Sequence, residues 1–330
     1  MEKITVIGAG SWGTALSLSL VKGGHPVFLT THSPSHIQAM EADRENKKYL
    51  PGVRLPEGLH LTASYDEAVE GADLVVFAVP AQHFRSTLEQ AAPFLTSDTL
   101  VVNVAKGIEI GTQLRLSEIA HILRRDLRYV TLSGPSHAEE VGRFLPTTLV
   151  AASEDPTAAD QVQALFMADW LRVYTSADVC GVELGGALKN IIALGAGISD
   201  GIGYGDNAKA ALMTRGMTEM ARLGMALGAR RETFFGLTGM GDLIVTCTSM
   251  HSRNRRCGIL IGEGVPPEKA VERIGMVVEG FYTVEAAVKL ARTAHVEMPI
   301  TESIYRCLHG GLTPQDAVAQ LMGRPKKREG

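Results

Sequence analysis

The sequence predicts an α/β protein in which a doubly wound sheet is followed by an all-α domain. Short β-branched runs alternate with helix-like segments from residue 4 to about residue 178, and the pattern is helical from Val179 onward. The chain has 330 residues, more than a typical single core, which indicates two domains. Its 35 glycines and 5% aromatic residues fit an α/β protein with many tight turns. We place the domains at 1–180 and 181–330.

Charge and hydropathy argue against large charged partners. The formal net charge of −4 gives no overall attraction to nucleic acid or to anionic lipid. The basic run Arg324–Gly330 is interpreted as a solvated tail. No apolar stretch reaches the roughly 18 to 20 residues that a membrane span requires, since Lys189 interrupts the longest one. We expect neither nucleic acid nor a membrane as a partner.

The cysteines and the first residues bear on location. Cys180, Cys247, Cys257 and Cys307 show no CxxC or other metal-ligand spacing, so we expect reduced thiols and no metal site. A strand pattern begins at Ile4 and leaves no room for a signal peptide. We therefore expect a cytoplasmic protein.

The first element of the predicted sheet belongs to a strand–turn–helix–strand unit. The β-branched run Ile4–Ile7 leads into the glycine-rich segment Gly8–Gly13, and a helix-like segment follows over Thr14–Lys22. A second strand is predicted over Pro26–Thr30 after two glycines that end the helix. A GxGxxG pattern is weak evidence alone, but this one directly follows a strand and opens a helix.

The three glycines of this turn each have a physical task. Gly8 turns the chain tightly, Gly10 lets the backbone approach a pyrophosphate, and Gly13 lets the helix pack on the strand. The free N–H groups at the helix start then face the anion. A tight turn without a ligand is the alternative. We expect a Rossmann-like, dinucleotide-binding N-terminal domain.

The end of the second strand bears on the choice of cofactor. NAD-binding folds place an acid there to hold the ribose 2′-OH, whereas residues 29–33 read Leu-Thr-Thr-His-Ser. A 2′-phosphate would meet no carboxylate, and His32 is placed to contact it or the adenosine. We expect NADPH or NADH as cofactor, with a mild preference for NADP.

The sheet continues with strands separated by helices predicted over residues 82–92, 117–124 and 156–168. The strands are Asp73–Val79, Thr99–Val104, Tyr129–Leu132, Pro146–Val150 and Leu171–Tyr174. The polar residues 34–60 contain three prolines and indicate short helices and a surface excursion. Lys106 stands at the carboxyl end of a strand, where doubly wound sheets bind ligands, and we expect it to be functional.

The segment Glu183–Asp206 is a nearly unbroken apolar and glycine run with one cation, Lys189. Apolar residues recur within it at helix spacing and form a broad face. A lysine in such a helix must extend to solvent, meet an anion or lose its proton easily. A solvent-facing lysine is the alternative to a functional one.

Two polar groups stand out after a predicted helix over Ala208–Leu227. Asp242 follows a glycine-rich segment and is interpreted either as a helix cap or as part of a site. Ser252, Arg253 and Asn254 offer hydroxyl, guanidinium and amide donors in consecutive positions, which suits phosphate. Taken alone, this triplet fits a basic surface turn equally well.

Together these motifs resemble one family nearly from end to end. The carriers are Gly8–Ala15, Ala105–Glu109, Ser133–Ser136, Leu188–Asn190, Gly239–Leu243, Thr246–Ser249, Ser252–Asn254 and Val278–Gly280. The chain is similar to the bacterial-type NAD(P)-dependent glycerol-3-phosphate dehydrogenases, which reduce dihydroxyacetone phosphate for glycerophospholipid synthesis. The segment from Lys189 to Asn254, combined with the N-terminal glycine motif, is specific to that family.

The resemblance implies roles for individual residues. It makes Lys189 the catalytic general acid/base, oriented by Asp242, and it places Arg253 and Asn254 on the substrate phosphate. The implied substrate-binding residues are Lys106, Gly134, Ser136, Lys189, Asp242, Ser252, Arg253 and Asn254. The implied cofactor-binding residues are Gly8, Gly10, Ser11, Trp12, Gly13, His32, Lys106, Ala138, Arg253, Val277 and Glu279. The resemblance also implies a homodimer.

This chain departs from the family pattern at two places. The family usually has an arginine near the end of the second strand, where this chain has Thr31 and His32. An aromatic residue, often phenylalanine, usually follows the Ser-Gly-Pro-Ser motif, where this chain has His137. The first departure leaves the preference between NAD and NADP open.

Two other functions fit part of the pattern. A β-hydroxyacid or 6-phosphogluconate type dehydrogenase shares the glycine motif and a helix with Lys followed by Asn, but the Ser252–Asn254 triplet argues against it. A noncatalytic dinucleotide-binding redox sensor needs no buried lysine and usually carries an output module, which the sequence lacks. A panel of hydroxyacids tested beside dihydroxyacetone phosphate would separate these readings.

Overall fold

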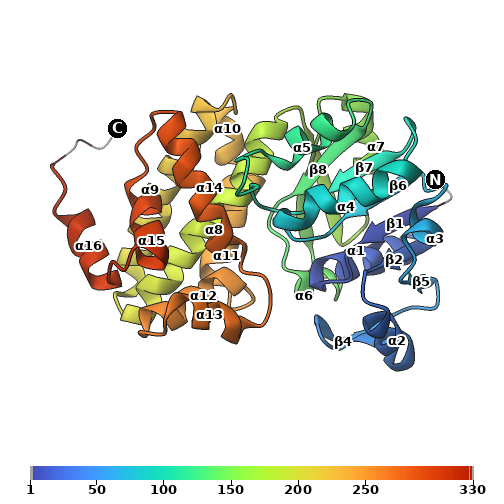
Figure 1. Cartoon of the computed structure of the whole chain (residues 1–330), viewed down its shortest axis with the longest axis horizontal. Helices are drawn as coiled ribbons and strands as arrows, with labels where there is room; N and C mark the ends of the chain where they lie inside the picture. Colours follow the sequence, from blue (N-terminus) through green and yellow to red (C-terminus); the bar gives the residue numbers. More distant parts are fainter. Residues whose placement is uncertain (1–2, 327, 329–330) are drawn as a thin grey trace.

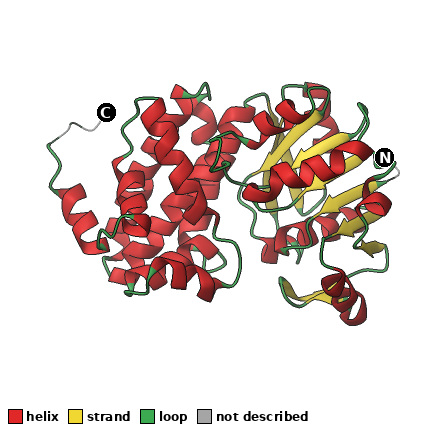
Figure 2. Ribbon diagram, viewed as in Figure 1, coloured by secondary structure: helices red, strands yellow, loops and turns green. Residues whose placement is uncertain are grey.

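The computed structural model describes residues 3–326 and residue 328. A sheet flanked by helices forms one half of the molecule, and a bundle of helices forms the other (Figures 1 and 2). The predicted fold class is confirmed. The predicted basic tail Arg324–Gly330 falls partly outside the described residues.

The main sheet has eight strands in the order β10-β9-β8-β7-β6-β1-β2-β5. The strands are β1 Ile4–Ile7, β2 Val27–Thr30, β5 Leu59–Thr62, β6 Leu74–Phe77, β7 Leu100–Asn103, β8 Arg128–Ser133, β9 Thr147–Ala152 and β10 Leu171–Ser176. Neighbours are parallel except β8 and β9. The strand order reverses beside β1, and ligands bind at the carboxyl ends of strands at such a point.

Helices cover both faces of the sheet because each face is apolar. On one face lie α1 Ser11–Lys22, α6 Ala138–Val141 and α7 Pro156–Phe166. On the other lie α3 Tyr65–Val69, α4 Phe84–Ala91 and α5 Leu116–Leu123. Short 3₁₀ turns, η1 Ala81–His83 and η2 Ala92–Phe94, flank α4.

Every strand that the sequence predicts is present, with ends shifted by at most two residues. The surface excursion over 34–60 contains helix α2 Pro34–Asp43 and a small hairpin, β3 Glu45–Asn46 with β4 Leu50–Arg54. The sequence reading missed β5, which completes the sheet beside β2. Its short edge run has two polar residues among four, so it lacks the β-branched pattern that marked the central strands.

All described elements after β10 are helices. They are α8 Val179–Ile202, α9 Gly205–Ala226, α10 Arg231–Phe234, the π-helical turn η3 Leu237–Gly241, α11 Asp242–Thr248, α12 Arg253–Gly262, α13 Pro267–Ile274, α14 Glu279–Thr293, α15 Pro299–His309 and α16 Pro314–Met322. The predicted domain boundary at residue 180 lies in the first turn of α8 and stays a prediction.

Helix α8 is the axis of the helical half and packs against α9, α11, α12 and α14. Its crossing with α12 is close because both helices carry glycine at the contact. A Cβ on Gly197 would lie 2.1 Å from the carbonyl oxygen of Arg255, and one on Gly258 would lie 2.1 Å from that of Leu194. This crossing places the start of α12 beside the middle of α8, where Lys189 lies.

A buried carboxylate fixes α8 to the sheet half. Glu183 Oε1 accepts hydrogen bonds from the Tyr129 hydroxyl at 3.0 Å and the Ser117 N–H at 2.9 Å. Arg115 Nη1 donates to Glu183 Oε2 at 3.1 Å. These contacts join α8 to β8 and α5 only six residues before Lys189.

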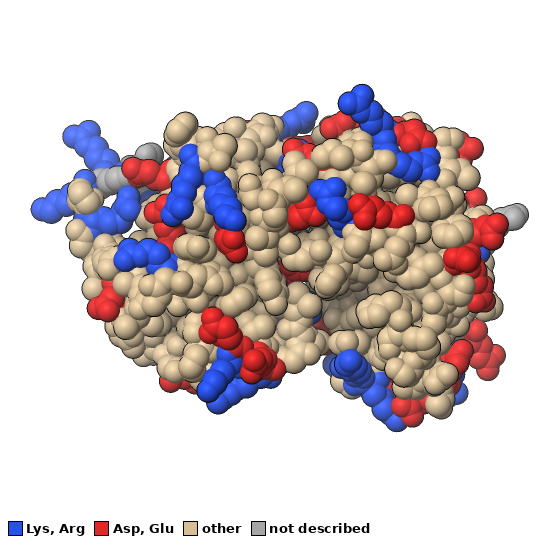
Figure 3. Space-filling view, in the orientation of Figure 1, with Lys and Arg blue, Asp and Glu red and all other residues tan. Residues whose placement is uncertain are grey.

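Helix α8 also corrects the expectation that no apolar stretch is as long as a membrane span. Among the described residues, this one helix passes that test by length and composition, and 94% of its apolar window is buried inside the protein. Lys189 does not interrupt the helix because its ammonium has partners within the fold. We assign α8 to the protein core. On the face in Figure 3, basic and acidic side chains are interspersed over both halves.

Candidate active site

The candidate site lies where helices α8, α11 and α12 meet the loops that follow β7 and β8. Its centre is the Asp242 carboxylate, which bridges two lysines from different halves of the molecule. Asp242 Oδ1 accepts from Lys189 Nζ at 2.8 Å, and Oδ2 accepts from Lys106 Nζ at 2.7 Å. The side chain of Asp242 is only 2% exposed. The sequence left Asp242 either as a cap or as a site residue, and the structure shows it bridging the two cations.

Lys189 sits in the apolar middle of α8, and its side chain is 7% exposed. Besides Asp242, its ammonium donates to Thr246 Oγ1 at 2.6 Å. Burial lowers the pKa of Lys189 to about 8; Asp242 opposes that change, and Lys106 adds to it. The alternative of a solvent-facing lysine is therefore wrong, and the pKa of this buried ammonium lies close to neutral pH.

Lys106 reaches the site from the loop after β7, as its position in the sequence predicted. It donates to the carbonyl oxygen of Gly134 at 2.8 Å and lies 3.4 Å from Ser136 Oγ. Gly134 has φ +135°, a conformation that other residues rarely adopt. The turn after β8 thus presents both of these predicted substrate residues to the Lys106 ammonium.

Asp242 stays ionised despite complete burial. Burial alone would raise its pKa, but the charges of Lys106 and Lys189 and their hydrogen bonds outweigh burial and lower the pKa. A carboxylate between two ammonium groups leaves a net positive charge in the site. Such a site suits an anionic substrate and a developing negative charge.

The three residues of the predicted phosphate-binding triplet, Ser252 to Asn254, have different partners in the structure. Ser252 is the N-cap of α12, and its Oγ accepts from the Arg255 N–H at 3.2 Å. Asn254 Nδ2 donates to Asn190 Oδ1 at 2.9 Å, and Asn254 Oδ1 accepts from the Gly280 N–H at 2.8 Å. These two side chains therefore already have structural tasks.

Arg253 is different from its two neighbours. It is half-buried, and none of the described residues accepts a hydrogen bond from its guanidinium. Burial lowers its pKa, against the opposing charges of Glu279 and Glu139. A forked donor without a protein partner, beside this site, is the group best placed to bind an anion.

Glu279 joins the start of α14 to the sheet half. Its Oε1 accepts from the Ala81 N–H, at the carboxyl end of β6, at 3.0 Å. Its Oε2 is buried and has no hydrogen-bond partner. Burial raises the pKa of Glu279 to about 7, against the opposing hydrogen bond from Ala81 and charge of Arg253. A buried polar atom without a partner indicates a place for a ligand group.

The glycine turn fits a dinucleotide. Gly8 has φ +114°, and a Cβ on this residue would lie 2.5 Å from the Ala78 carbonyl oxygen. A Cβ on Gly13 would lie 1.9 Å from the Gly8 carbonyl oxygen. In contrast, a Cβ on Gly10 would meet nothing within 4 Å. Helix α1 starts there with no side-chain cap and no acidic residue in its first turn. This leaves open space and free N–H groups in front of the helix for a pyrophosphate.

The remaining predicted cofactor residues are distributed along the sheet half and the start of α14. Trp12 Nε1 is buried without a partner, and Ala138 is buried at the start of α6. His32 is exposed just after β2, and Val277 is half-buried two residues before Glu279. The structure places Ser11 at the start of α1. Their roles stay predictions.

Two residues that the sequence analysis did not assign to the site belong to it. Thr246 accepts from Lys189 and donates to the Asp242 carbonyl oxygen at 2.6 Å. Asn190 Nδ2 lies 3.3 Å from the Lys106 carbonyl oxygen and 3.2 Å from that of Gly186. The i, i+4 spacing of Thr246 from Asp242 is the signal that could have identified it.

Comparison with known proteins gives one consistent result. Family models for the N-terminal and C-terminal parts of NAD-dependent glycerol-3-phosphate dehydrogenase match residues 3–159 and 178–319. The glycerol-3-phosphate dehydrogenase [NAD(P)+] of Moorella thermoacetica is 54% identical over 329 residues, covering 99% of this chain and 98% of the relative. That of Bacillus subtilis is 52% identical over 334 residues, covering 100% and 96%. The crystal structure of glycerol-3-phosphate dehydrogenase from Coxiella burnetii superposes with a TM-score of 0.93 at 39% identity, covering 98% of this chain and 99% of that one. The chain therefore belongs to the NAD-dependent glycerol-3-phosphate dehydrogenase family, which confirms the resemblance seen in its motifs.

Proposed function

We propose that this protein is a glycerol-3-phosphate dehydrogenase [NAD(P)+] that interconverts dihydroxyacetone phosphate and sn-glycerol 3-phosphate. Relatives with that name match it over nearly its whole length at about half identity. The observation that carries the mechanism is the Lys106–Asp242–Lys189 bridge, which holds two ammonium groups at the carboxyl edge of the sheet.

Lys189 is proposed as the general acid and base. A bound nicotinamide supplies or accepts the hydride at C2, and the protein handles the proton. An ammonium has three donors, of which Lys189 uses two on Asp242 and Thr246. The third can donate to the C2 oxygen during reduction. In the opposite direction the neutral amine takes the proton of the C2 hydroxyl.

Lys106 and Asp242 support that proton transfer. The Lys106 ammonium lies on the same carboxylate as Lys189 and adds positive charge near the C2 oxygen. Asp242 fixes the direction of both lysines. We propose that Gly134 and Ser136, held beside Lys106, complete this side of the substrate site, with Ser252 and Asn254 shaping the other side.

Arg253 is proposed to bind the substrate phosphate, far from the reacting carbon. We expect Arg253→Ala to raise KM for dihydroxyacetone phosphate by about 100-fold while kcat changes much less, because a charge-assisted forked contact is lost. Steady-state kinetics with varied substrate measure this split. Arg255→Ala is the matched control, since Arg255 pairs with Asp200 at 2.7 Å and not with substrate. An unchanged KM with lost cofactor binding would contradict the phosphate role.

The pH dependence should follow Lys189. Because the pKa of Lys189 is lowered to about 8, its ammonium is present below that pH and is lost above it. We expect kcat/KM for ketone reduction to fall as the pH rises through about 8, and kcat/KM for alcohol oxidation to rise through the same region, because kcat/KM reports the pKa of the free enzyme. Rate profiles in both directions test this. An inflection near the ordinary lysine value of 10.5 would contradict it.

The overall reaction has a direct test. Purified protein is mixed with dihydroxyacetone phosphate and NADPH, or NADH in parallel, and the near-ultraviolet absorbance of the reduced nicotinamide is followed. We expect rapid oxidation of reduced cofactor only when the ketone is present. If the protein binds both cofactors but oxidises neither, a panel of hydroxyacids is the next test and the proposal fails.

The wider setting is also a proposal. The resemblance supports a cytoplasmic homodimer that supplies sn-glycerol 3-phosphate for glycerophospholipid synthesis, with a dinucleotide domain over 1–180 and a catalytic domain over 181–330. Analytical ultracentrifugation tests the homodimer. Depletion of the protein in cells, followed by measurement of labelled glycerophospholipid, tests the metabolic role.

A further inference from the structure

A pair of histidines lies beside the candidate active site and spans the two halves of the molecule. His137 follows Ser136 in the turn after β8 and is the N-cap residue of α6. His251 precedes Ser252 in the loop between α11 and α12. The centres of the two imidazole rings lie 5.6 Å apart, with the ring planes tilted by 54°. This histidine pair therefore joins the segment that holds Ser136 to the segment that holds Arg253.

His137 also contacts helix α11 directly. Its Nε2 lies 3.4 Å from the Val245 carbonyl oxygen, and a neutral ring that carries its proton on Nε2 donates to this oxygen. The next residue of α11 is Thr246, which accepts a hydrogen bond from Lys189. His137 thus fixes the turn after β8 to the helix that holds the partners of Lys189.

The charged groups around His137 come from several elements. Lys189 of α8 opposes a positive charge on the ring, whereas Glu139 and Glu140 of α6 favour one. Burial is the main cause that lowers the pKa of His137 from its ordinary value of 6.5, and Lys189 adds to it. The two glutamates and the hydrogen bond to α11 oppose that change. His137 is therefore neutral at neutral pH, and it gains a proton only in acid.

Further cations of the site make a second positive charge here unfavourable. Lys106 Nζ lies 3.4 Å from Ser136 Oγ, in the same turn as His137, and Arg253 follows His251 by two residues. Two protonated rings with centres 5.6 Å apart would also repel each other. The contact between the rings is therefore favourable while they are neutral and unfavourable once both carry a charge.

We propose that His137 and His251 are positioning residues, which hold the two walls of the substrate site together while their rings are neutral and release them when both rings are protonated. One wall is the turn that holds Ser136, and the other is the start of α12, which holds Arg253. The proposed proton transfer uses neither ring. The inference rests on the proposed function, because it concerns the affinity for that substrate. It sets an acid limit on substrate binding, at lower pH than the titration of Lys189 at about 8.

The first test is KM for dihydroxyacetone phosphate at two pH values, with saturating reduced cofactor. His137→Gln keeps a side-chain N–H donor but does not titrate. From about pH 7.5 to about pH 5.5, we expect KM of the unchanged protein to rise about tenfold relative to that of His137→Gln, while kcat differs less than about twofold. Comparing the two proteins at each pH cancels the titration of the substrate phosphate, which is common to both.

His251→Phe tests the partner ring. This variant keeps a ring against His137 and removes one of the two charges. We expect the rise of KM in acid to shrink to less than about threefold, because Lys189 is then the main cation that opposes a proton on His137.

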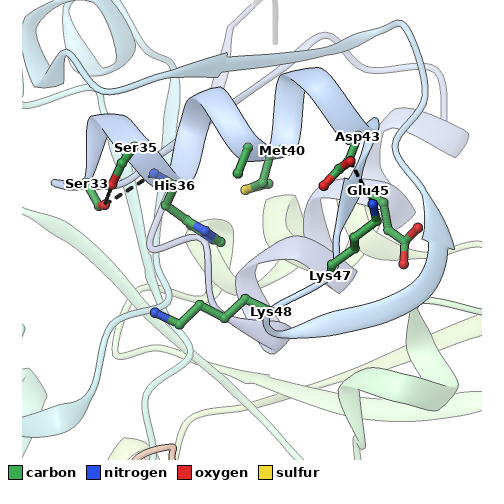
Figure 4. A pocket seen from close by; sticks show the side chains of 9 residues that line it. Ser33, Ser35, His36, Met40, Asp43, Glu45, Lys47 and Lys48 are labelled. Atoms are coloured by element: carbon green, nitrogen blue, oxygen red, sulfur yellow. Dashed lines mark hydrogen bonds and ion pairs between the residues drawn. The ribbon is translucent and has the colours of Figure 1, made fainter.

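His36→Gln is the matched control. His36 is also a partly buried histidine whose pKa is lowered by burial, and its Nε2 lies 3.4 Å from the Ala9 carbonyl oxygen. It lines a cavity of about 290 Å³ between α2 and the β3–β4 hairpin, whose lining residues all lie within 33–48 (Figure 4). Since this cavity belongs to the sheet half alone, we expect KM of His36→Gln to follow that of the unchanged protein at both pH values.

Hydrogen exchange tests the same contact without substrate. Exchange of the backbone N–H groups of residues 134–142 and 245–252 is compared between the unchanged protein and His137→Gln. We expect faster exchange in the unchanged protein at about pH 5.5 and equal rates at about pH 7.5, because protonation opens this contact only where position 137 titrates. Circular dichroism verifies that both proteins stay folded in acid.

Three results would overturn the inference. The first is a dependence of KM on pH that is the same in His137→Gln and the unchanged protein. The second is a KM that falls in acid relative to the variant, which would make the charged rings ligands of the phosphate. The third is equal hydrogen exchange at both pH values. In contrast, failure to reduce dihydroxyacetone phosphate at about pH 7.5, with hydrogen exchange as expected, would refute the proposed substrate and leave the contact between the halves standing.

Discussion

Lys189→Ala is expected to lower kcat by about 10²- to 10⁴-fold in both directions while NADPH still binds, because proton transfer by a positioned group contributes that much. In the intact protein, the ammonium is held by Asp242 and Thr246, and Lys189 belongs to the buried helix α8. Alanine at this position removes the proton donor and leaves the dinucleotide turn untouched. Rapid-quench kinetics and NADPH fluorescence titration measure the two quantities.

The control for this prediction separates chemistry from folding. Alanine leaves a cavity in place of the lysine side chain, so Lys189→Met, which keeps the volume, is measured beside it. Lys189→Arg keeps a charge on Asp242 but does not give up its proton, and we expect it to be nearly as slow. Lys289→Ala, an exposed lysine paired with Glu285, should behave as the unchanged protein. Near-normal turnover in Lys189→Met would refute the assignment of the general acid.

Most of the fold was predictable because its signals are local. The central strands are runs of buried β-branched residues, and the glycine turn between β1 and α1 has a fixed spacing, so both are read from neighbouring residues. The edge strand β5 was missed because its order comes from pairing with β2, not from its own pattern.

The site was predictable only in part. Residues with a telling local sequence could be predicted, whereas contacts between residues far apart in the chain could not. Lys189 and Lys106 were selected from their local setting. Their common carboxylate lies 53 residues from Lys189 and 136 from Lys106. The contact of Glu279 with the Ala81 N–H spans 198 residues. No single-sequence pattern reports such pairs, because packing of α8, α11 and α14 creates them.

The polar triplet Ser252–Asn254 shows a second limit of prediction from the sequence. Three adjacent polar residues appeared equivalent in the sequence, yet the start of α12 gives each a different surrounding. Ser252 caps the helix, Asn254 joins Asn190 to Gly280, and Arg253 alone keeps its donors. The sequence identified all three residues as hydrogen-bonding groups. Which of them stabilise the fold and which is free to bind a ligand depends on their positions at the start of α12.

Asp242→Asn is expected to slow ketone reduction more than alcohol oxidation at neutral pH, with a loss in reduction of about 100-fold. The charge of Asp242 raises the pKa of Lys189 from the still lower value that burial and Lys106 would give. Without that charge the pKa falls below about 8, and the ammonium needed for reduction becomes scarce at neutral pH. The neutral amine needed for oxidation becomes more abundant, so the pH profiles of both directions should move to lower pH together.

Asp200→Asn is the matched control for the structural part of this effect. Asp200 is also on the buried axis of the helical half and also bridges two cations, Lys209 at 2.8 Å and Arg255 at 2.7 Å. Removing one charge from a buried pair costs about 3–5 kcal/mol, and both variants should lose thermal stability, more so Asp242→Asn because Asp242 is more deeply buried. Only Asp242→Asn should displace the pH profiles. A displacement of equal size in both variants would mean that Asp242 acts through stability alone and does not tune Lys189.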